Sequence, residues 1–154
     1  MMSLEERARS IRLVCTDIDG VLTSGELHYD GSQGHTKSFH VRDGAAIKWL
    51  QRCGIPVAFI SGLDSPATQE RARHLGIEDC FLGHLAKKPV LETLRAKYGL
   101  ELSQVAHLGD DLADLPGIGL RRGQIGGEVV LKRCPLGDDD LQYALHVVDD
   151  LGEV

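Results

Sequence analysis

The sequence lacks long apolar runs and has no excess of basic charge. Its 154 residues contain no uninterrupted apolar stretch of the roughly 18 residues that a membrane-spanning helix requires. Acidic residues outnumber basic ones by 23 to 17, which gives a formal net charge of −6. Nucleic acids and anionic membrane surfaces bind basic faces, so we expect neither of them as a partner.

Cysteine pairs at metal-binding or redox spacing are also absent. The four cysteines lie far apart and form no C-x-x-C pair: Cys15, Cys53, Cys80 and Cys134. This spacing disfavours a zinc site and a thioredoxin-like motif, and it predicts buried, reduced thiols. The charged first fourteen residues contain no apolar segment of the kind found in signal peptides. We therefore expect a cytoplasmic protein.

Short apolar runs alternate with helical patterns along the chain. Three apolar runs, residues 13–16, 56–60 and 105–108, are bounded by Asp or Gly and are typical of strands buried on both faces. Between them lie helical patterns that end at Gly54, Gly76 and Gly99, the second beginning at Ser65–Pro66 and the third at Pro89. This order predicts an α/β fold, a Rossmann-like three-layer parallel sheet with helices on both faces. The length suits one domain over residues 1–154.

One segment interrupts this alternation directly after the first strand. Residues 25–41, GELHYDGSQGHTKSFHV, contain an expected strand, a glycine-rich turn at Asp30 and Gly31, and a second strand ending near Val41. The pattern predicts an inserted β-hairpin. Ligands of such sheets bind beyond the carboxyl ends of the strands, so the hairpin would overhang the ligand end.

Polar residues follow each of the three predicted strands. Asp17 and Asp19 come after the first strand, Ser61 after the second and Asp110 after the third, while Lys87 starts a helix. Because the carboxyl ends of parallel strands meet at one edge of a sheet, we expect these side chains to gather there.

Several carboxylates at one edge would repel one another unless a cation neutralises them. Magnesium takes one or two carboxylates together with waters and a phosphate oxygen. The sequence therefore predicts a Mg²⁺ site formed by Asp17, the backbone carbonyl of Asp19 and Asp110. We expect Asp111 and Asp114 to support these ligands by hydrogen bonds.

The same residues suit phosphoryl transfer, which needs positioning and neutralisation of charge. Asp17 would be the nucleophile that forms an aspartyl-phosphate. Asp19 would protonate the leaving alkoxide and later deprotonate the attacking water. Ser61 can donate its hydroxyl to a phosphoryl oxygen, and Lys87 can offer a compact positive charge to another.

The order D-x-D-G, strand-end serine, lysine and G-D-D resembles the haloacid dehalogenase superfamily of aspartyl-phosphate phosphatases. The segments TDIDGVLT, KSFHVRDGAAIK, SGLDSP and GDDLADLP further resemble its small capless branch, the 3-deoxy-D-manno-octulosonate 8-phosphate phosphatases. The resemblance implies Mg²⁺ as cofactor, a phosphorylated sugar acid as substrate and a place in lipopolysaccharide biosynthesis. It also implies a homotetramer in which a neighbouring subunit, through the hairpin, helps close each active site.

The resemblance also implies a set of substrate contacts. These residues are Asp19, His40, Val41, Arg42, Asp43, Gly44, Lys48, Arg71 and Lys87. Taken alone, the run from His40 to Gly44 also suits a helix start, where an acidic residue favours the helix dipole. Likewise, an arginine on a polar helix face is commonly solvated.

The chain departs from this branch at three places, of which Thr23, Ser24 and Gly25 in place of the family's T-D-G are the smallest change. Leu63 stands where the family has an arginine, so a bidentate donor for a carboxylate is missing. The resemblance covers roughly residues 11–116, and the atypical part from about 117 to 154 lacks the expected final strand. A diverged carboxyl terminus and a shifted reading frame are both compatible with this tail.

Alternative functions follow from these departures. A nonulosonate 9-phosphate phosphatase, a broader sugar phosphatase and a catalytically weak structural relative keep the same motif residues. A response-regulator receiver uses a similar acidic cluster, but it places the phospho-accepting aspartate after the third strand. Here the D-x-D pair follows the first strand, which disfavours a receiver.

Overall fold

The computed structural model describes residues 3–29, 35–110 and 128–131. The elements in chain order are α1 (Leu4–Ser10), β1 (Leu13–Thr16), β2 (His28–Tyr29), β3 (His35–Thr36), α2 (Val41–Arg52), β4 (Val57–Ile60), α3 (Pro66–Leu75), β5 (Asp79–Phe81), α4 (Lys87–Tyr98), the 3₁₀ turn η1 (Leu102–Gln104), β6 (Val105–Gly109) and β7 (Glu128–Leu131).

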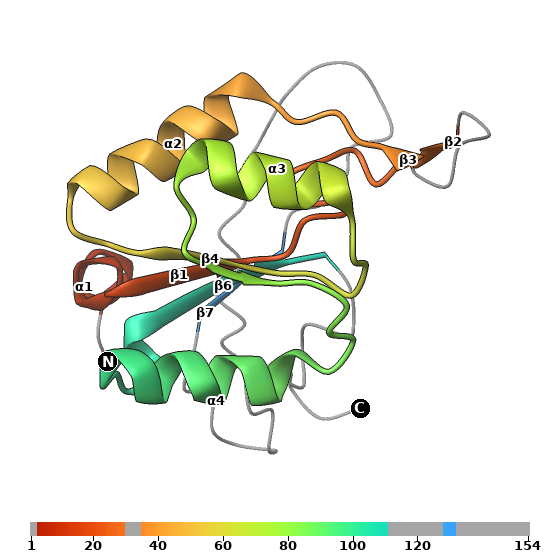
Figure 1. Cartoon of the computed structure of the whole chain (residues 1–154). Coiled ribbons are helices and arrows are strands. Elements are labelled where there is room, and N and C mark those ends of the chain that lie inside the picture. Colours follow the sequence, from red (N-terminus) through yellow and green to blue (C-terminus); the bar gives the residue numbers. More distant parts are fainter. Residues whose placement is uncertain (1–2, 30–34, 111–127, 132–154) are drawn as a thin grey trace, which may run out of the picture.

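A five-stranded parallel sheet forms the middle layer, in the order β5-β4-β1-β6-β7. Helices α2 and α3 cover one face and α4 covers the other (Figure 1). The α/β fold expected from the sequence is thereby confirmed. The three strands expected from the apolar runs are the three central ones, with β1 between β4 and β6.

The two edge strands are additions to the sequence prediction. Strand β5 pairs with β4, and β7 pairs with β6 through Gly109 opposite Leu131. The expectation that the tail lacks a final strand is wrong, because residues 128–131 supply one. The run Glu-Val-Val-Leu contains two β-branched residues, which suit a strand added to the open edge of β6. The rest of the atypical tail lies outside the described residues.

Each face of the sheet has its own apolar core. The core under α4 consists of Leu13, Cys15, Ala58, Ile60, Val90, Leu91, Leu94 and Val105. The core under α2 and α3 consists of Ile18, Ile47, Val57, Phe59, Ala72, Leu75 and Ile77. Successive residues of β4 alternate between the two cores, as expected for a strand covered on both faces. These cores fix the strand ends that carry the site.

The helix ends follow the expected signals. Ser65 and Pro66 begin α3, and Gly76 and Gly99 end α3 and α4 in left-handed conformation. Helix α4 begins at Lys87, as expected for that lysine, and Pro89 lies two residues further on in its first turn. On α2, the Trp49 side chain is 69% exposed.

The hairpin is present but shorter than expected. Its antiparallel strands β2 and β3 contain two residues each, and the second strand ends at Thr36 rather than near Val41, where α2 begins. The turn residues 30–34 lie outside the described part. Figure 1 shows the hairpin beyond the end of the sheet from which α3 starts, and thus at the predicted ligand end.

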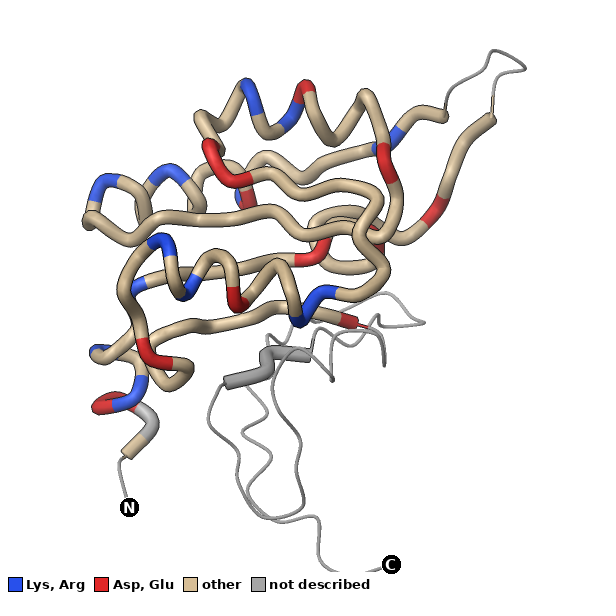
Figure 2. Tube along the Cα trace, turned by 60° about the horizontal axis from the view of Figure 1, so that its bottom comes forward, with Lys and Arg blue, Asp and Glu red and all other residues tan. Residues whose placement is uncertain are grey.

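The charged residues are mixed over the surface, and the cysteines differ in burial. Figure 2 shows acidic and basic positions interspersed over the described elements. Cys15 is buried as expected, whereas Cys53 is exposed, and Cys134 lies outside the described residues. Within residues 3–29, 35–110 and 128–131, no helix has the length and apolar character needed to cross a membrane.

Candidate active site

The carboxyl ends of β1, β4 and β6 lie side by side and carry the predicted polar residues. Thr16 is opposite Phe59 of β4 and Leu108 of β6, so the segments that follow these strands start at the same edge. The backbone N–H of Asp17 also donates to the carbonyl of Leu108, at 2.8 Å. Topology alone therefore brings Asp17, Ser61 and Asp110 to one place.

Asp17 and Lys87 form a buried ion pair at this edge. The Lys87 Nζ atom lies 2.8 Å from Asp17 Oδ2, and the two side chains are 4% and 11% exposed. The other carboxylate oxygen accepts from the backbone N–H of Ile18 at 2.7 Å. Removing one partner of such a pair leaves a buried charge uncompensated, which costs about 3–5 kcal/mol.

The position of Lys87 works against helix stability. It is the first residue of α4, where the helix dipole is positive, and the first turn contains no acidic residue. A cation and the N–H groups of a helix start together form a positive environment beside Asp17. Such an environment is suited to an anion.

Asp19 is paired with Lys37, a residue that the sequence analysis did not select. The Lys37 Nζ atom lies 2.7 Å from Asp19 Oδ1 and 2.8 Å from Oδ2. The Lys37 side chain is 0% exposed and that of Asp19 is 28% exposed. The two aspartates of the D-x-D motif are therefore each bound by a lysine from a different segment. The sequence signals for Lys37 are its place on the hairpin that returns to the sheet end and its place at the start of KSFHVRDGAAIK, one of the segments that resemble the phosphatase branch.

Asp110 lies directly against the turn that follows Asp19. Gly20 has a φ of +85°, and a Cβ atom added to it would fall 1.7 Å from Asp110 Oδ2. The absence of a side chain at Gly20 thus leaves the space that the Asp110 carboxylate occupies. The third strand thereby brings its carboxylate to the D-x-D turn of the first.

These oxygen donors fit a hard divalent cation. Asp17 and Asp110 could supply carboxylates and the backbone of Asp19 a carbonyl, a set that matches the preference of Mg²⁺ for few protein ligands. Within the described ranges, no group of three or more His, Cys, Asp or Glu side chains is arranged to hold a metal. The predicted supporting residues Asp111 and Asp114 lie outside the described residues. A two-carboxylate site that leaves room for water and phosphate is compatible with this arrangement.

Ser61 is held in the loop after β4. Its hydroxyl donates to the carbonyl of Leu63 at 3.2 Å and accepts from the N–H of Leu63 at 3.1 Å. The residue is 1% exposed. Leu85, 78% exposed, covers Gly62, because a Cβ atom there would lie 2.9 Å from Leu85 Cδ2. The side chain of Leu85 thus lies next to the loop in which Leu63 stands at the position where the family has an arginine.

Some of the expected substrate contacts instead connect α2 to α3. The carbonyl of His40 accepts from Arg71 Nη2 at 3.1 Å, and the Arg71 guanidinium lies 5.5 Å from the centre of the Phe39 ring. His40 Nδ1 accepts from the N–H of Arg42 and caps α2. A Cβ atom on buried Gly44 would meet Arg71 Nη2 at 2.6 Å. Arg71 therefore has a structural role in fixing the start of α2.

The other expected contacts are placed less favourably in this chain. Val41 is 82% exposed, and Asp43 lies in the first turn of α2. The Lys48 Nζ atom would lie 3.4 Å from a Cβ atom on Gly76 at the far end of α3. Helix α3 begins at the site edge, so the structure does not bring Lys48 to Asp17. Substrate contact by these residues stays a prediction.

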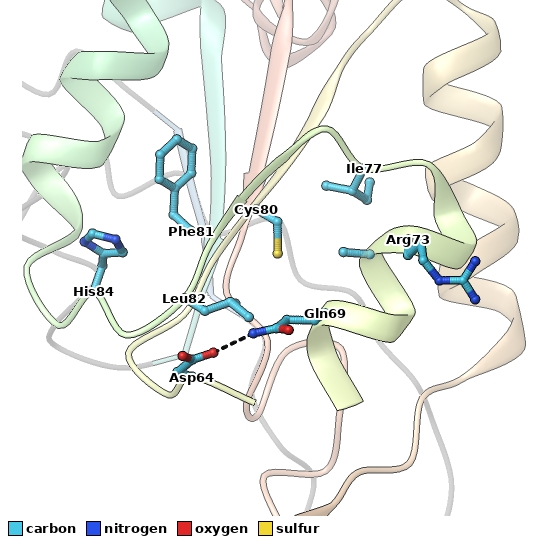
Figure 3. Close-up of a pocket in the computed structure, with 9 residues that line it drawn as sticks. Asp64, Gln69, Arg73, Ile77, Cys80, Phe81, Leu82 and His84 are labelled. Carbon is cyan, nitrogen blue, oxygen red and sulfur yellow. Dashed lines mark hydrogen bonds between the residues drawn. The ribbon is translucent and has the colours of Figure 1, made fainter. Parts of the chain in front are cut away.

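A hollow of about 530 Å³ lies between α3 and the segment after β5. Figure 3 shows Cys80 and Leu82 on the β5 side of this hollow and the hydrogen bond from Gln69 to Asp64, which is 2.9 Å long. Its wall is connected to the site, because the N–H of His84 donates to the carbonyl of Ser61 at 3.0 Å. None of the predicted catalytic residues lines it.

Comparison with known proteins identifies relatives of this chain. Residues 39–119 match the model of the haloacid dehalogenase-like hydrolases. The chain is 46% identical over 113 residues to the 3-deoxy-D-manno-octulosonate 8-phosphate phosphatase KdsC of Haemophilus influenzae, covering 73% of this chain and 63% of the relative. It is 34% identical over 149 residues to KdsC of Salmonella typhi, covering 96% and 77%. The chain thus spans about 60% of the length of the Haemophilus and Yersinia pestis relatives.

Solved structures agree. The Moraxella catarrhalis phosphatase of the same name, in complex with a magnesium ion, a phosphate ion and a KDO molecule, superposes with a TM-score of 0.71 at 38% identity, over 73% of this chain and 65% of that one. The cobalt-bound Haemophilus influenzae enzyme superposes with a TM-score of 0.75 at 42% identity, over 84% and 73%. With its parallel sheet, its site at the strand ends and these relatives, the chain belongs to the haloacid dehalogenase-like hydrolases.

Proposed function

We propose that this protein is a Mg²⁺-dependent phosphatase that hydrolyses a phosphomonoester through an aspartyl-phosphate on Asp17. The observation that carries the proposal is the buried contact of 2.8 Å between Asp17 and Lys87 at the first turn of α4. A carboxylate nucleophile next to a cation and a helix N-terminus is the arrangement that a phosphoryl group requires.

Asp17, the backbone carbonyl of Asp19 and Asp110 would hold the metal. When bound, Mg²⁺ neutralises charge on the phosphoryl oxygens and orients the ester. The relatives from Moraxella and Haemophilus were solved with magnesium and with cobalt, which supports a divalent-metal site in this family.

The side chains divide the remaining work. Asp17 attacks phosphorus while Asp19 protonates the departing alkoxide, and Asp19 then deprotonates the water that hydrolyses the aspartyl-phosphate. Lys87 contacts a phosphoryl oxygen and compensates its charge. Ser61 donates to another once its hydroxyl turns away from the Leu63 carbonyl, to which it now donates at 3.2 Å.

For the substrate we propose 3-deoxy-D-manno-octulosonate 8-phosphate, with the free sugar acid and phosphate as products. The proposal is supported by the activity for which the relatives from Haemophilus influenzae and Salmonella typhi are named. Leu85, which is exposed and lies against Gly62 beside Ser61, favours the alternative of a broader sugar phosphatase, and a nonulosonate 9-phosphate phosphatase is the other alternative.

Assembly and location remain predictions. Tyr29 on the hairpin and Trp49 on α2 are 73% and 69% exposed, and large exposed apolar side chains favour subunit contact. We propose a cytoplasmic homotetramer on this basis and on the resemblance. The place in lipopolysaccharide biosynthesis stays a prediction too.

Phosphate release from a panel of esters tests the function. The panel holds the octulosonate 8-phosphate, a nonulosonate 9-phosphate and simple sugar phosphates, each with Mg²⁺ and with chelator. We expect chelator-sensitive turnover that Asp17→Asn abolishes, whereas Glu78→Gln, an exposed carboxylate before β5, leaves it unchanged. Preference for another ester would overturn the proposed substrate and keep the proposed chemistry. No turnover of any ester would leave the catalytically weak relative as the explanation.

A further inference from the structure

Among the described residues, Lys37 is a lysine near the site whose side chain is buried and which the proposed chemistry does not use. It follows β3 directly and its side chain is 0% exposed. Burying an ammonium is costly unless it is paired, so its partner determines its role. Within the described ranges, Asp19 is that partner, with both carboxylate oxygens within 2.8 Å.

The contact also decides how Asp19 is oriented. Asp17 is fixed from two sides, by Lys87 and by the N–H of Ile18. For the Asp19 carboxylate, the described residues supply Lys37 alone. Without Lys37, the carboxylate would be free to change rotamer at the edge of the site. An acid that must meet a leaving oxygen loses efficiency when its geometry is lost.

We propose that Lys37 is a positioning residue that holds the Asp19 carboxylate in the orientation in which it acts on the leaving group, and that it thereby connects the hairpin to the reacting centre. This inference rests on the proposed function for its kinetic consequence. The ion pair itself does not depend on that function. Lys37 acts through Asp19 and is not itself in contact with the phosphoryl group.

The leaving group provides the kinetic test. An alkyl phosphate releases a strongly basic alkoxide that needs a proton, whereas p-nitrophenyl phosphate releases a stable phenolate that needs little help. The ratio kcat/KM covers the steps up to the first departure, so the later role of Asp19 as a base does not enter. We expect Lys37→Met to lower kcat/KM about 100-fold for the sugar phosphate and less than about threefold for p-nitrophenyl phosphate.

Matched variants separate positioning from other roles. Lys88→Met removes an exposed lysine and should leave both values unchanged. Lys37→Arg keeps the charge and should recover part of the loss. In an Asp19→Asn background, Lys37→Met should cost nothing further, because its effect passes through the missing carboxylate. Equal losses on both esters, a loss confined to KM, or multiplied losses in the double variant would overturn the proposal.

A urea unfolding cycle without substrate tests the pair independently of activity. Asp19→Asn and Lys37→Met should each lower the midpoint, and the double variant should lower it by less than the two single losses together. Additive losses would mean that the contact does not exist. If the wild-type protein is inactive but the stability losses of the two single variants are not additive, the proposed function is refuted and the contact between Asp19 and Lys37 is supported.

Discussion

Replacing Gly20 by alanine should separate the metal site from the fold. The added Cβ atom would lie 1.7 Å from Asp110 Oδ2, whereas real Cβ contacts essentially never fall under 3.0 Å. The Asp110 carboxylate must therefore withdraw by more than 1 Å. Displacements of this size at a reacting centre can cost about 100-fold in rate. We expect Gly20→Ala to weaken Mg²⁺ binding at least about tenfold, or about 1.4 kcal/mol.

Gly25→Ala is the matched control. Gly25 has a φ of +82°, close to the +85° of Gly20, so both alanines carry similar backbone strain. This strain is about 1–3 kcal/mol for a residue in a sparsely populated conformation. However, a Cβ atom on Gly25 would have its nearest neighbours at 3.6 Å, an ordinary contact with Gly20. Both variants should lose similar stability, and only Gly20→Ala should lose metal affinity.

Calorimetric titration with Mg²⁺ measures the difference without relying on turnover. Urea unfolding measures the free energy of unfolding of each variant, and we expect similar values for the two. Phosphate release at increasing Mg²⁺ should show a higher half-activating concentration for Gly20→Ala. Equal Mg²⁺ affinities in the two variants would refute the reasoning, because the displaced Asp110 would then not be a ligand.

Two further predictions concern the thiols and alkaline pH. Burial, and secondarily the charge of Asp79, raises the pKa of Cys15 to about 12. We therefore expect iodoacetamide at pH 8 to label the exposed Cys53 and to spare Cys15 until urea unfolds the protein. Equal labelling of the two cysteines in the folded protein, measured by peptide mass spectrometry, would contradict this prediction. The hydrogen bond to Asp79 raises the pKa of Lys97, and burial, followed by its bond to Asp79, raises that of Tyr98. A group whose pKa is raised in the folded protein stabilises the fold below its unfolded pKa and loses this contribution as the pH rises through the folded pKa. The urea midpoint should therefore fall above about pH 10, and it should fall less steeply in Asp79→Asn. Parallel plots of urea midpoint against pH for the two proteins would contradict the role of Asp79.

The central strands could be predicted from the sequence because both of their faces are covered. Such strands are continuous apolar runs, as in Val57–Ile60, whose four residues are all buried. Edge strands give a weaker signal, since they are short and pair on one side only. Strand β5 is three residues long and begins with an aspartate, and β7 lies in the atypical tail. Both were missed for this reason.

The residues of the site also divide into those that the sequence could predict and one that it could not. Asp17, Ser61 and Lys87 could be found because each follows a central strand or starts a helix, and parallel topology places those ends at one edge. Lys37 could not be found in this way. It follows a strand of two residues, and so short a hairpin has no apolar alternation that would show which side chains return to the sheet.

The repulsion between the two carboxylates of the D-x-D motif can therefore be relieved in two ways. A divalent cation was expected to relieve their repulsion, and the structure adds a lysine for each: Lys87 for Asp17 and Lys37 for Asp19. Because the two lysines come from different segments, the carboxylates are held by separate partners although one residue separates them. A nucleophile and an acid must act on opposite sides of one bond, so separate partners serve the proposed chemistry better than a shared one. The metal then needs to neutralise the phosphoryl group rather than the aspartates alone.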